Sequence, residues 1–151
     1  MSIKVAVPKE TAEGERRVAI ESSVIAKLVK LGAEVLVETG AGSAAHIPDS
    51  AFSGATIVPT ANDLYQQADI VLKVQPPSDA EIAQLKEGSV LIGMLQPYQN
   101  PERIAALKAK NITAYAMELI PRISRAQAMD VLSSQAAIAG YKAAIMGADL
   151  A

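Results

Sequence analysis

Short runs of aliphatic and β-branched residues alternate with segments of helical periodicity along the chain, and this alternation limits the fold more than any other feature. The aliphatic runs predict six strands, at residues 3–7, 34–37, 55–58, 70–74, 89–95 and 112–117. The intervening segments predict helices at residues 22–31, 62–67, 78–86 and 101–110. Strands that alternate with helices of roughly ten residues form crossover units. We therefore expect an α/β domain with a parallel, twisted sheet and helices on both faces.

Residue types at the helix ends support these boundaries. Gly32 follows the first helix at the position where a left-handed residue commonly ends a helix. Ser78 and Glu81 have the spacing of a capping box, in which each side chain accepts a hydrogen bond from the backbone N–H of the other residue. Asn100 and Pro101 supply a cap and a first-turn proline for the helix that follows them.

A glycine-rich segment at 39–48 follows the second predicted strand. It lacks the third glycine of a dinucleotide-binding fingerprint and leads to Pro48 in place of a helix, so we interpret it as a flexible loop. Asp49 is expected to cap a short helix after the loop. His46 is the only histidine, and we interpret it as an exposed polar residue. One histidine without any cysteine argues against a zinc site.

Composition excludes several classes of partner. The 151 residues are 50% hydrophobic and 20% charged, which is enough for one core and one domain over residues 1–151. Fourteen basic and sixteen acidic residues give a net charge of −2 without a basic run, so nothing supports binding to nucleic acid. The absence of cysteine excludes disulfides and thiol catalysis and fits a reducing cytosol. No apolar run approaches the roughly 18 residues that span a bilayer, so we expect a soluble chain without direct membrane insertion.

The segment 117–135 carries the most distinctive chemistry of the chain. It leaves an apolar strand, turns at a proline, presents Arg122 and Arg125, and enters a long helix. Ser124 and Gln127 have the capping-box spacing, which predicts that this helix starts at Ser124.

Two faces of this long helix differ in character. One is an apolar stripe that we expect to be buried in the core: Met129, Leu132, Ala136, Ala139, Ala143 and Met146. The other carries small or polar residues: Asp130, Ser133, Ser134, Ala137, Gly140, Tyr141 and Ala144. A face of this kind admits either another backbone at close range or a flat ligand, so close packing and a ring-binding wall are both open interpretations.

The candidate site lies at one edge of the predicted sheet, because open parallel sheets bind ligands beyond the carboxyl ends of their strands. The loop residues expected at that edge are Lys9, Glu10, Arg16, Arg17, Lys73, Gln75, Gln96, Tyr98, Arg122, Arg125, Gln127 and Asp130. They offer amides and cations, but no serine–histidine pair and no paired carboxylates for acid–base catalysis. The two arginines at 16–17 stand beside two glutamates, so they are also interpreted as a solvated charge cluster.

Five segments together resemble a known family: residues 3–10, 17–20, 38–42, 69–74 and 121–130. They are similar to the N-terminal domain shared by alanine dehydrogenase and the proton-translocating NAD(P) transhydrogenase, and the resemblance covers essentially the whole chain. The motif that begins at Pro121 resembles the alpha subunit of the transhydrogenase, its NAD(H)-binding component. The resemblance implies a three-layer fold of Rossmann or flavodoxin-like type.

Two positions separate the two branches of this family. In the alanine dehydrogenase branch, the position of Gln75 is a lysine and that of Gln96 is a histidine, and this pair binds and protonates the keto acid. Neither amide supplies a proton at neutral pH. Arg17, which would clamp the substrate carboxylate in that branch, is present. The sequence therefore favours a transhydrogenase, with an alanine dehydrogenase-type amino-acid oxidoreductase or a noncatalytic interaction domain that forms homo-oligomers as alternatives.

The resemblance implies hydride transfer between NAD(H), held by this component, and NADP(H), held by a partner component, coupled to proton translocation in the complete enzyme. Arg122 would reach the pyrophosphate or carboxamide region of NAD(H). Asp130 and Ser133 would hydrogen-bond the carboxamide, and Gln127 would bridge towards the second nicotinamide. Gln127 and Asp130 are thus the expected catalytic-site residues, without an acid or base, because the cofactors supply the hydride chemistry.

The family also implies partners outside residues 1–151. A Rossmann-type NAD-binding domain follows the long helix in the family and is absent from this chain. The other expected partners are the membrane part and the NADP-binding component. We therefore expect a cytoplasmic domain that lies peripheral to the inner membrane in the complete enzyme, and that is inactive and binds NAD(H) weakly when alone.

Overall fold

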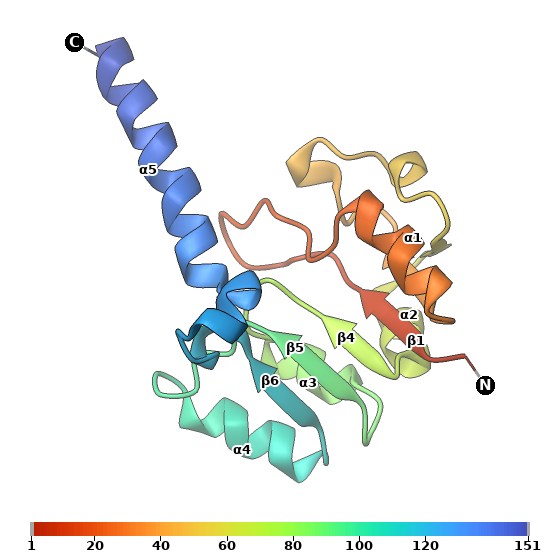
Figure 1. Cartoon of the computed structure of the whole chain (residues 1–151). Coiled ribbons are helices and arrows are strands. Elements are labelled where there is room, and N and C mark those ends of the chain that lie inside the picture. Colours follow the sequence, from red (N-terminus) through yellow and green to blue (C-terminus); the bar gives the residue numbers. More distant parts are fainter. Residues whose placement is uncertain (1, 151) are drawn as a thin grey trace.

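The computed structural model describes residues 2–150, and its centre is a six-stranded sheet. The strands are β1 (Lys4–Val7), β2 (Glu34–Glu38), β3 (Thr56–Val58), β4 (Ile70–Leu72), β5 (Val90–Gly93) and β6 (Thr113–Ala116). All neighbours pair in parallel, in the order β3-β2-β1-β4-β5-β6 (Figure 1). This is the strand order of a doubly wound Rossmann-type sheet, whose topological switch point lies between β1 and β4. The predicted α/β class is confirmed.

Five α-helices accompany the sheet: α1 (Ser22–Lys30), α2 (Ala61–Gln67), α3 (Asp79–Gln84), α4 (Pro101–Ala109) and α5 (Val131–Leu150). The predicted capping box of Ser78 and Glu81 is confirmed at α3, as is the Asn100 cap with its following proline at α4. Gly32 ends α1 with φ of 87°, and its N–H donates to the Val29 carbonyl. Short 3-10 turns occupy Ser43–Ala45, Asp49–Ala51, Met117–Leu119 and Ser124–Met129.

Helices cover both faces of the sheet, but unequally. On one face, α2, α3 and α4 bury a core that includes Leu64, Ile82 and Leu107. On the other face, α1 covers β1 and β2 through Ile25, together with Phe52 from the segment before β3. No α-helix among residues 2–150 lies over β4, β5 and β6 on this second face (Figure 1). That half of the sheet is open.

The start of α5 differs from the prediction. The backbone is extended at Ile123 and again at Asp130, so residues 124–129 form 3-10 turns and the regular helix begins at Val131. Asp130 is the cap: its carboxylate accepts hydrogen bonds from the Ser133 N–H at 2.9 Å and the Ser133 hydroxyl at 2.6 Å. Ser124 makes no capping hydrogen bond, so the predicted box of Ser124 and Gln127 is wrong.

The predicted apolar stripe of α5 is also not core in this chain. No residue of α5 is buried, and its distal part projects away from the sheet (Figure 1). Met129 and Met146 are each 52% exposed. The helical periodicity identified the apolar residues correctly, but periodicity does not show which surface, if any, covers them.

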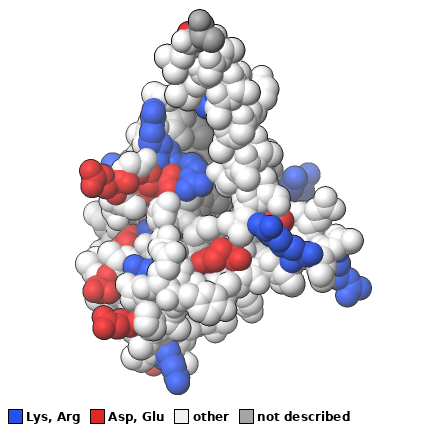
Figure 2. All heavy atoms as spheres, turned by 90° about the vertical axis from the view of Figure 1, so that its left-hand side faces the viewer, with Lys and Arg blue, Asp and Glu red and all other residues white. Residues whose placement is uncertain are grey.

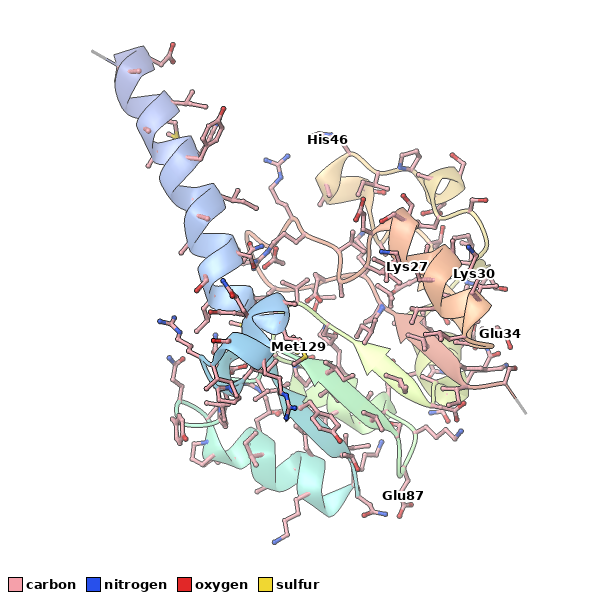
Figure 3. All side chains as sticks on the ribbon, in the orientation of Figure 1. Lys27, Lys30, Glu34, His46, Glu87 and Met129 are labelled. Atoms are coloured by element: carbon pink, nitrogen blue, oxygen red, sulfur yellow. The ribbon has the colours of Figure 1, made fainter. Side chains whose placement is uncertain are left out.

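The glycine-rich segment is held by side chains, which differs from the flexible loop we predicted. Asp49 is the first residue of its 3-10 turn and does not cap it; instead its carboxylate accepts from the Gly40 N–H at 2.8 Å and from the Thr39 hydroxyl at 2.7 Å. These hydrogen bonds lower the pKa of Asp49. Gly42 is packed so closely that a Cβ there would lie 2.6 Å from the Ile47 carbonyl oxygen. His46 lies at the outer end of this segment, away from the sheet (Figure 3).

Candidate functional site

A buried ionic cluster lies beneath the carboxyl edge of the sheet. The Lys73 ammonium, on a side chain only 1% exposed, lies 2.6 Å from a Glu81 carboxylate oxygen and 3.4 Å from a Glu10 carboxylate oxygen. The Tyr65 hydroxyl donates to the same Glu81 oxygen at 3.0 Å. Burial acts to raise the pKa of Glu81, but hydrogen bonds from Lys73 and the Ser78 N–H outweigh it and lower that pKa. Burial and the Glu81 charge raise the pKa of Tyr65.

This cluster anchors the loop that follows β4. Glu10 accepts hydrogen bonds from the backbone N–H groups of Val74 at 2.6 Å and Gln75 at 3.3 Å. Lys73 was expected among the ligand-facing loop residues. Instead its ammonium is paired with two carboxylates inside the protein, so it supports the site from behind.

The loop between β1 and α1 carries a second ionic pair. Glu15 accepts hydrogen bonds from Arg17 Nε at 2.8 Å and Arg17 Nη2 at 2.6 Å, and from the Gln75 side-chain amide at 2.7 Å. Its carboxylate is 6% exposed, and the Arg17 hydrogen bonds are the main reason that the pKa of Glu15 falls to about 2. Arg17 Nη1 donates to Gln135 Oε1 at 2.9 Å, which ties this loop to the foot of α5. Arg17 is therefore an organised structural element.

Arg16 has a different environment. Its Nε donates to the Ala44 carbonyl at 3.2 Å, and its Nη2 lies 3.2 Å from His46 Nε2, both at the exposed surface. The two adjacent arginines therefore point to different parts of the chain, and of the two it is Arg17 that reaches the carboxyl edge near α5.

Glu118 fixes the loop after β5. Its carboxylate accepts from the Leu95 N–H at 2.9 Å and from the Gln96 N–H at 2.5 Å. Gln96 adopts a left-handed backbone with φ of 51°, which is uncommon outside glycine. The two hydrogen bonds hold this unfavourable conformation in place. No sequence pattern indicated this role, since only the loop start at Glu118 could be predicted.

We expect Glu118→Gln to lower the free energy of unfolding by about 1–3 kcal/mol, because an amide cannot accept both backbone hydrogen bonds with the strength of a carboxylate. Urea denaturation followed by circular dichroism measures this change. Glu102→Gln is the matched control, since Glu102 is exposed in the first turn of α4. An equal, small effect of both substitutions would show that the Glu118 contacts do not hold the loop.

A pocket of about 720 Å³ opens above these elements, on the uncovered half of the sheet. Its polar walls come from Arg17, Lys73, Gln75, Gln96 and Gln135. Its apolar walls include Val18, Leu72, Ile92, Met94, Met117 and Leu132. The pocket lies beyond the carboxyl ends of β4, β5 and β6, with the β1–α1 loop along one side. This is where doubly wound sheets bind small molecules.

The predicted site residues lie beside this pocket and do not line it. Asp130 and Ser133 are hydrogen-bonded to each other on either side of Val131 and Leu132, which do line it. The Ser133 hydrogen bonds, assisted by the charge of Arg122, lower the pKa of Asp130.

Arg122, Arg125 and Gln127 are exposed on the turn next to Asp130. Met129 marks the end of this turn at the foot of α5 (Figure 3). Tyr98 is 87% exposed and is not part of the pocket wall. The polar residues that the prediction missed are Glu15, Glu118 and Gln135, whose roles depend on contacts between distant segments.

Two further classes of site are absent from the part of the chain that the structure describes. No group of three histidine, aspartate or glutamate side chains among residues 2–150 is arranged to hold a metal ion. No helix within the same range is long and apolar enough to cross a membrane.

The fold and the pocket define a doubly wound α/β domain with a small-molecule site at the edge where the strand order reverses. Residues 6–139 match the family model described as the alanine dehydrogenase/PNT N-terminal domain. The chain belongs to this family.

Relatives of known name fall into the two branches of the family. The chain is 54% identical, over 97% of its length, to an NAD(P) transhydrogenase subunit alpha protein of Rhodospirillum rubrum, and spans 40% of that protein. It is 34% identical, over 97% of its length, to alanine dehydrogenase of Mycobacterium tuberculosis, and spans 39% of it. The transhydrogenase relative is thus considerably more similar.

Solved structures show the same ranking. The transhydrogenase from Sinorhizobium meliloti superposes with a TM-score of 0.90 at 46% identity, over 94% of this chain and 43% of that one. An L-alanine dehydrogenase superposes with a TM-score of 0.73 at 32% identity, over 77% of this chain and 32% of that one.

Proposed function

We propose that this chain is the N-terminal domain of the NAD(H)-binding alpha subunit of an NAD(P) transhydrogenase. The observation that carries the proposal is the pocket beside the 121–133 turn, in a chain 54% identical to a transhydrogenase alpha subunit. The pocket volume of about 720 Å³ and its mixed apolar and amide walls suit a nicotinamide ring with part of its nucleotide. In the complete enzyme, hydride passes between NAD(H) on this component and NADP(H) on a partner, coupled to proton translocation.

The side chains of this domain orient the ring and do not exchange protons with it. Asp130 and Ser133 are already fixed by their mutual hydrogen bonds, so their remaining hydrogen-bonding positions can hold a carboxamide in one orientation. Arg122 supplies a cation beside Asp130, and the exposed Gln127 extends towards the second nucleotide. When bound, the nicotinamide itself supplies the hydride chemistry.

The amides at Gln75 and Gln96 argue against an amino-acid dehydrogenase. Both side chains line the pocket, where such an enzyme would place its proton-transferring groups. An amide cannot take up or release a proton at neutral pH. Orientation of a cofactor is the chemistry that remains for this set of side chains.

The uncovered surfaces indicate where the partner components bind. α5 is apolar around most of its circumference, and Figure 2 shows it as an almost uniformly uncharged column. A helix of this kind is normally covered on more than one side. We propose that the remaining transhydrogenase components cover α5 and the open half of the sheet, and hold this domain at the cytoplasmic side of the inner membrane. Association of two copies of this chain through α5 is the competing arrangement, and light scattering at several concentrations distinguishes them, since the competing arrangement requires a dimer of the isolated chain.

Saturation-transfer NMR with NADH tests the site. We expect the nicotinamide protons to receive more saturation than the adenine protons, with a Kd on the order of millimolar, because a ring contact supplies only part of dinucleotide affinity. Arg122→Gln should weaken the transfer to the nicotinamide, and Arg125→Gln on the same turn serves as the control. Saturation centred on the adenine, or submicromolar binding by calorimetry, would contradict the proposal.

A further inference from the structure

The charges around the pocket are unusual for a site that contains an arginine. Two cations, Arg17 and Lys73, line the pocket, and each is paired with a carboxylate. Four carboxylates hold the pocket walls: Glu15, Glu10, Glu81 and Glu118. The walls therefore carry more negative than positive charge, and an anionic ligand would meet no unpaired cation among the described residues that form them.

The hydrogen bonds of Glu15 and Arg17 also set the directions of two glutamines. Gln75 uses its Nε2 to donate to Glu15 at 2.7 Å, which leaves its Oε1 as an acceptor. Gln135 uses its Oε1 to accept from Arg17 at 2.9 Å, which leaves its Nε2 as a donor. The pocket thus presents one fixed acceptor and one fixed donor, on the two sides of the Glu15–Arg17 pair.

A primary carboxamide has both a donor and an acceptor, whereas a carboxylate has acceptors only. We infer that Glu15 makes this pocket selective for a neutral carboxamide over the corresponding carboxylate, by occupying the Arg17 guanidinium and by turning Gln75 to present its oxygen. The inference rests on the proposed function and adds the residue that determines ligand selectivity. Glu15 is a positioning residue, because it acts through Arg17 and Gln75.

The pair nicotinamide and nicotinate provides a direct test, since the two molecules share a ring and differ only in amide or carboxylate. Titrations of the isotope-labelled chain at pH 7.5 and constant ionic strength, followed by amide NMR shifts, measure both affinities. For the unmodified chain we expect nicotinamide to bind at least about tenfold more tightly than nicotinate, as one charge-assisted hydrogen bond would account for. The side-chain amide signals of Gln75 and Gln135 should shift with nicotinamide.

Glu15→Gln should remove this preference or reverse it, because Arg17 then becomes available to a carboxylate. Glu13→Gln is the matched control: it removes the same charge from the same loop at an exposed position, and should leave the ratio of affinities unchanged. Gln75→Lys is the second variant if Glu15→Gln does not fold. Its ammonium can still donate to Glu15 while it adds a positive charge, so it should also move the preference towards nicotinate.

Three results would overturn the inference. Equal affinity of the unmodified chain for both molecules, or an unchanged ratio in both Glu15→Gln and Gln75→Lys, would refute the selectivity while leaving the proposed function intact. Failure of either molecule to shift any pocket signal would refute the inference and the proposed ring site together.

Discussion

Lys73→Met should lower the free energy of unfolding by about 3–5 kcal/mol, because it removes the cation from a buried cluster and leaves two carboxylates uncompensated. In the intact cluster, the Lys73 ammonium contacts both Glu10 and Glu81, at 3.4 Å and 2.6 Å. Urea denaturation at pH 7 measures the loss. Since domains of this size are stable by about 5–15 kcal/mol, the variant is expected to be close to unfolding.

Lys86→Met is the matched control for this experiment. Lys86 pairs with Asp69 at 2.8 Å, but both side chains are more than 40% exposed. An exposed pair contributes about 0–1 kcal/mol, so the same substitution there should have little effect. Comparable losses for the two variants would show that the buried cluster has no special role in stability.

The unmodified chain and Lys73→Met should also respond oppositely to acid. In the unmodified chain the pKa values of Glu81 and Glu15 lie below their unfolded values, that of Glu15 at about 2. Their contribution to stability is therefore complete above the unfolded pKa, near pH 4.5, and is lost as pH falls through the folded pKa values. In Lys73→Met the buried carboxylates have no cation, so their protonation should instead restore stability as pH falls from 7 to 5. A decline in that range would contradict this account of the cluster.

Asp130→Ala should lower the rate of hydride transfer about 100-fold in an alpha subunit that contains this domain and is assembled with its partner components. The reason is that Asp130 holds Ser133 at 2.6 Å and would fix the carboxamide of NAD(H), so its loss lets the ring rotate. Transfer of deuterium from 4-deuterated NADH to NADP+, followed by mass spectrometry, measures the chemical step directly.

Asp130→Asn separates the two roles of this residue. Asparagine caps helices as well as aspartate, so α5 should keep its start in this variant. The helix content by circular dichroism should be unchanged, while hydride transfer still falls, by about tenfold, because the negative charge beside Arg122 is lost. Full activity in both variants would exclude Asp130 from the site.

Local residue chemistry was sufficient to predict most elements of the fold. All six predicted strands are present, shorter by one or two residues at some ends, because side-chain patterns do not show where pairing stops. Caps that depend on residues close in sequence were confirmed where one signal stood alone, as at Ser78 and Glu81. The start of α5 was wrong because Ser124 and Asp130 are competing caps a short distance apart, and only the extended backbone at Asp130 distinguishes them.

The candidate site was only partly predictable. The carboxyl edge of the sheet and the 121–133 turn follow from topology and motif. The structure puts the turn residues beside the pocket, whereas the pocket wall also requires Gln135 and the Glu15–Arg17 pair. Arg17 and Gln135 are far apart in the sequence, and no local pattern connects them.

The amino-acid sequence by itself determined the α/β class, the family and the absence of proton-transferring side chains at Gln75 and Gln96, because these depend on residue identity and short-range spacing. Only the tertiary structure decided the order of the strands, the burial of Lys73 between two carboxylates, and the pairing of Arg17 with Glu15. Those features depend on which distant segments meet. The charge that a ligand encounters is a sum over such meetings, so it cannot be read from the chain in order.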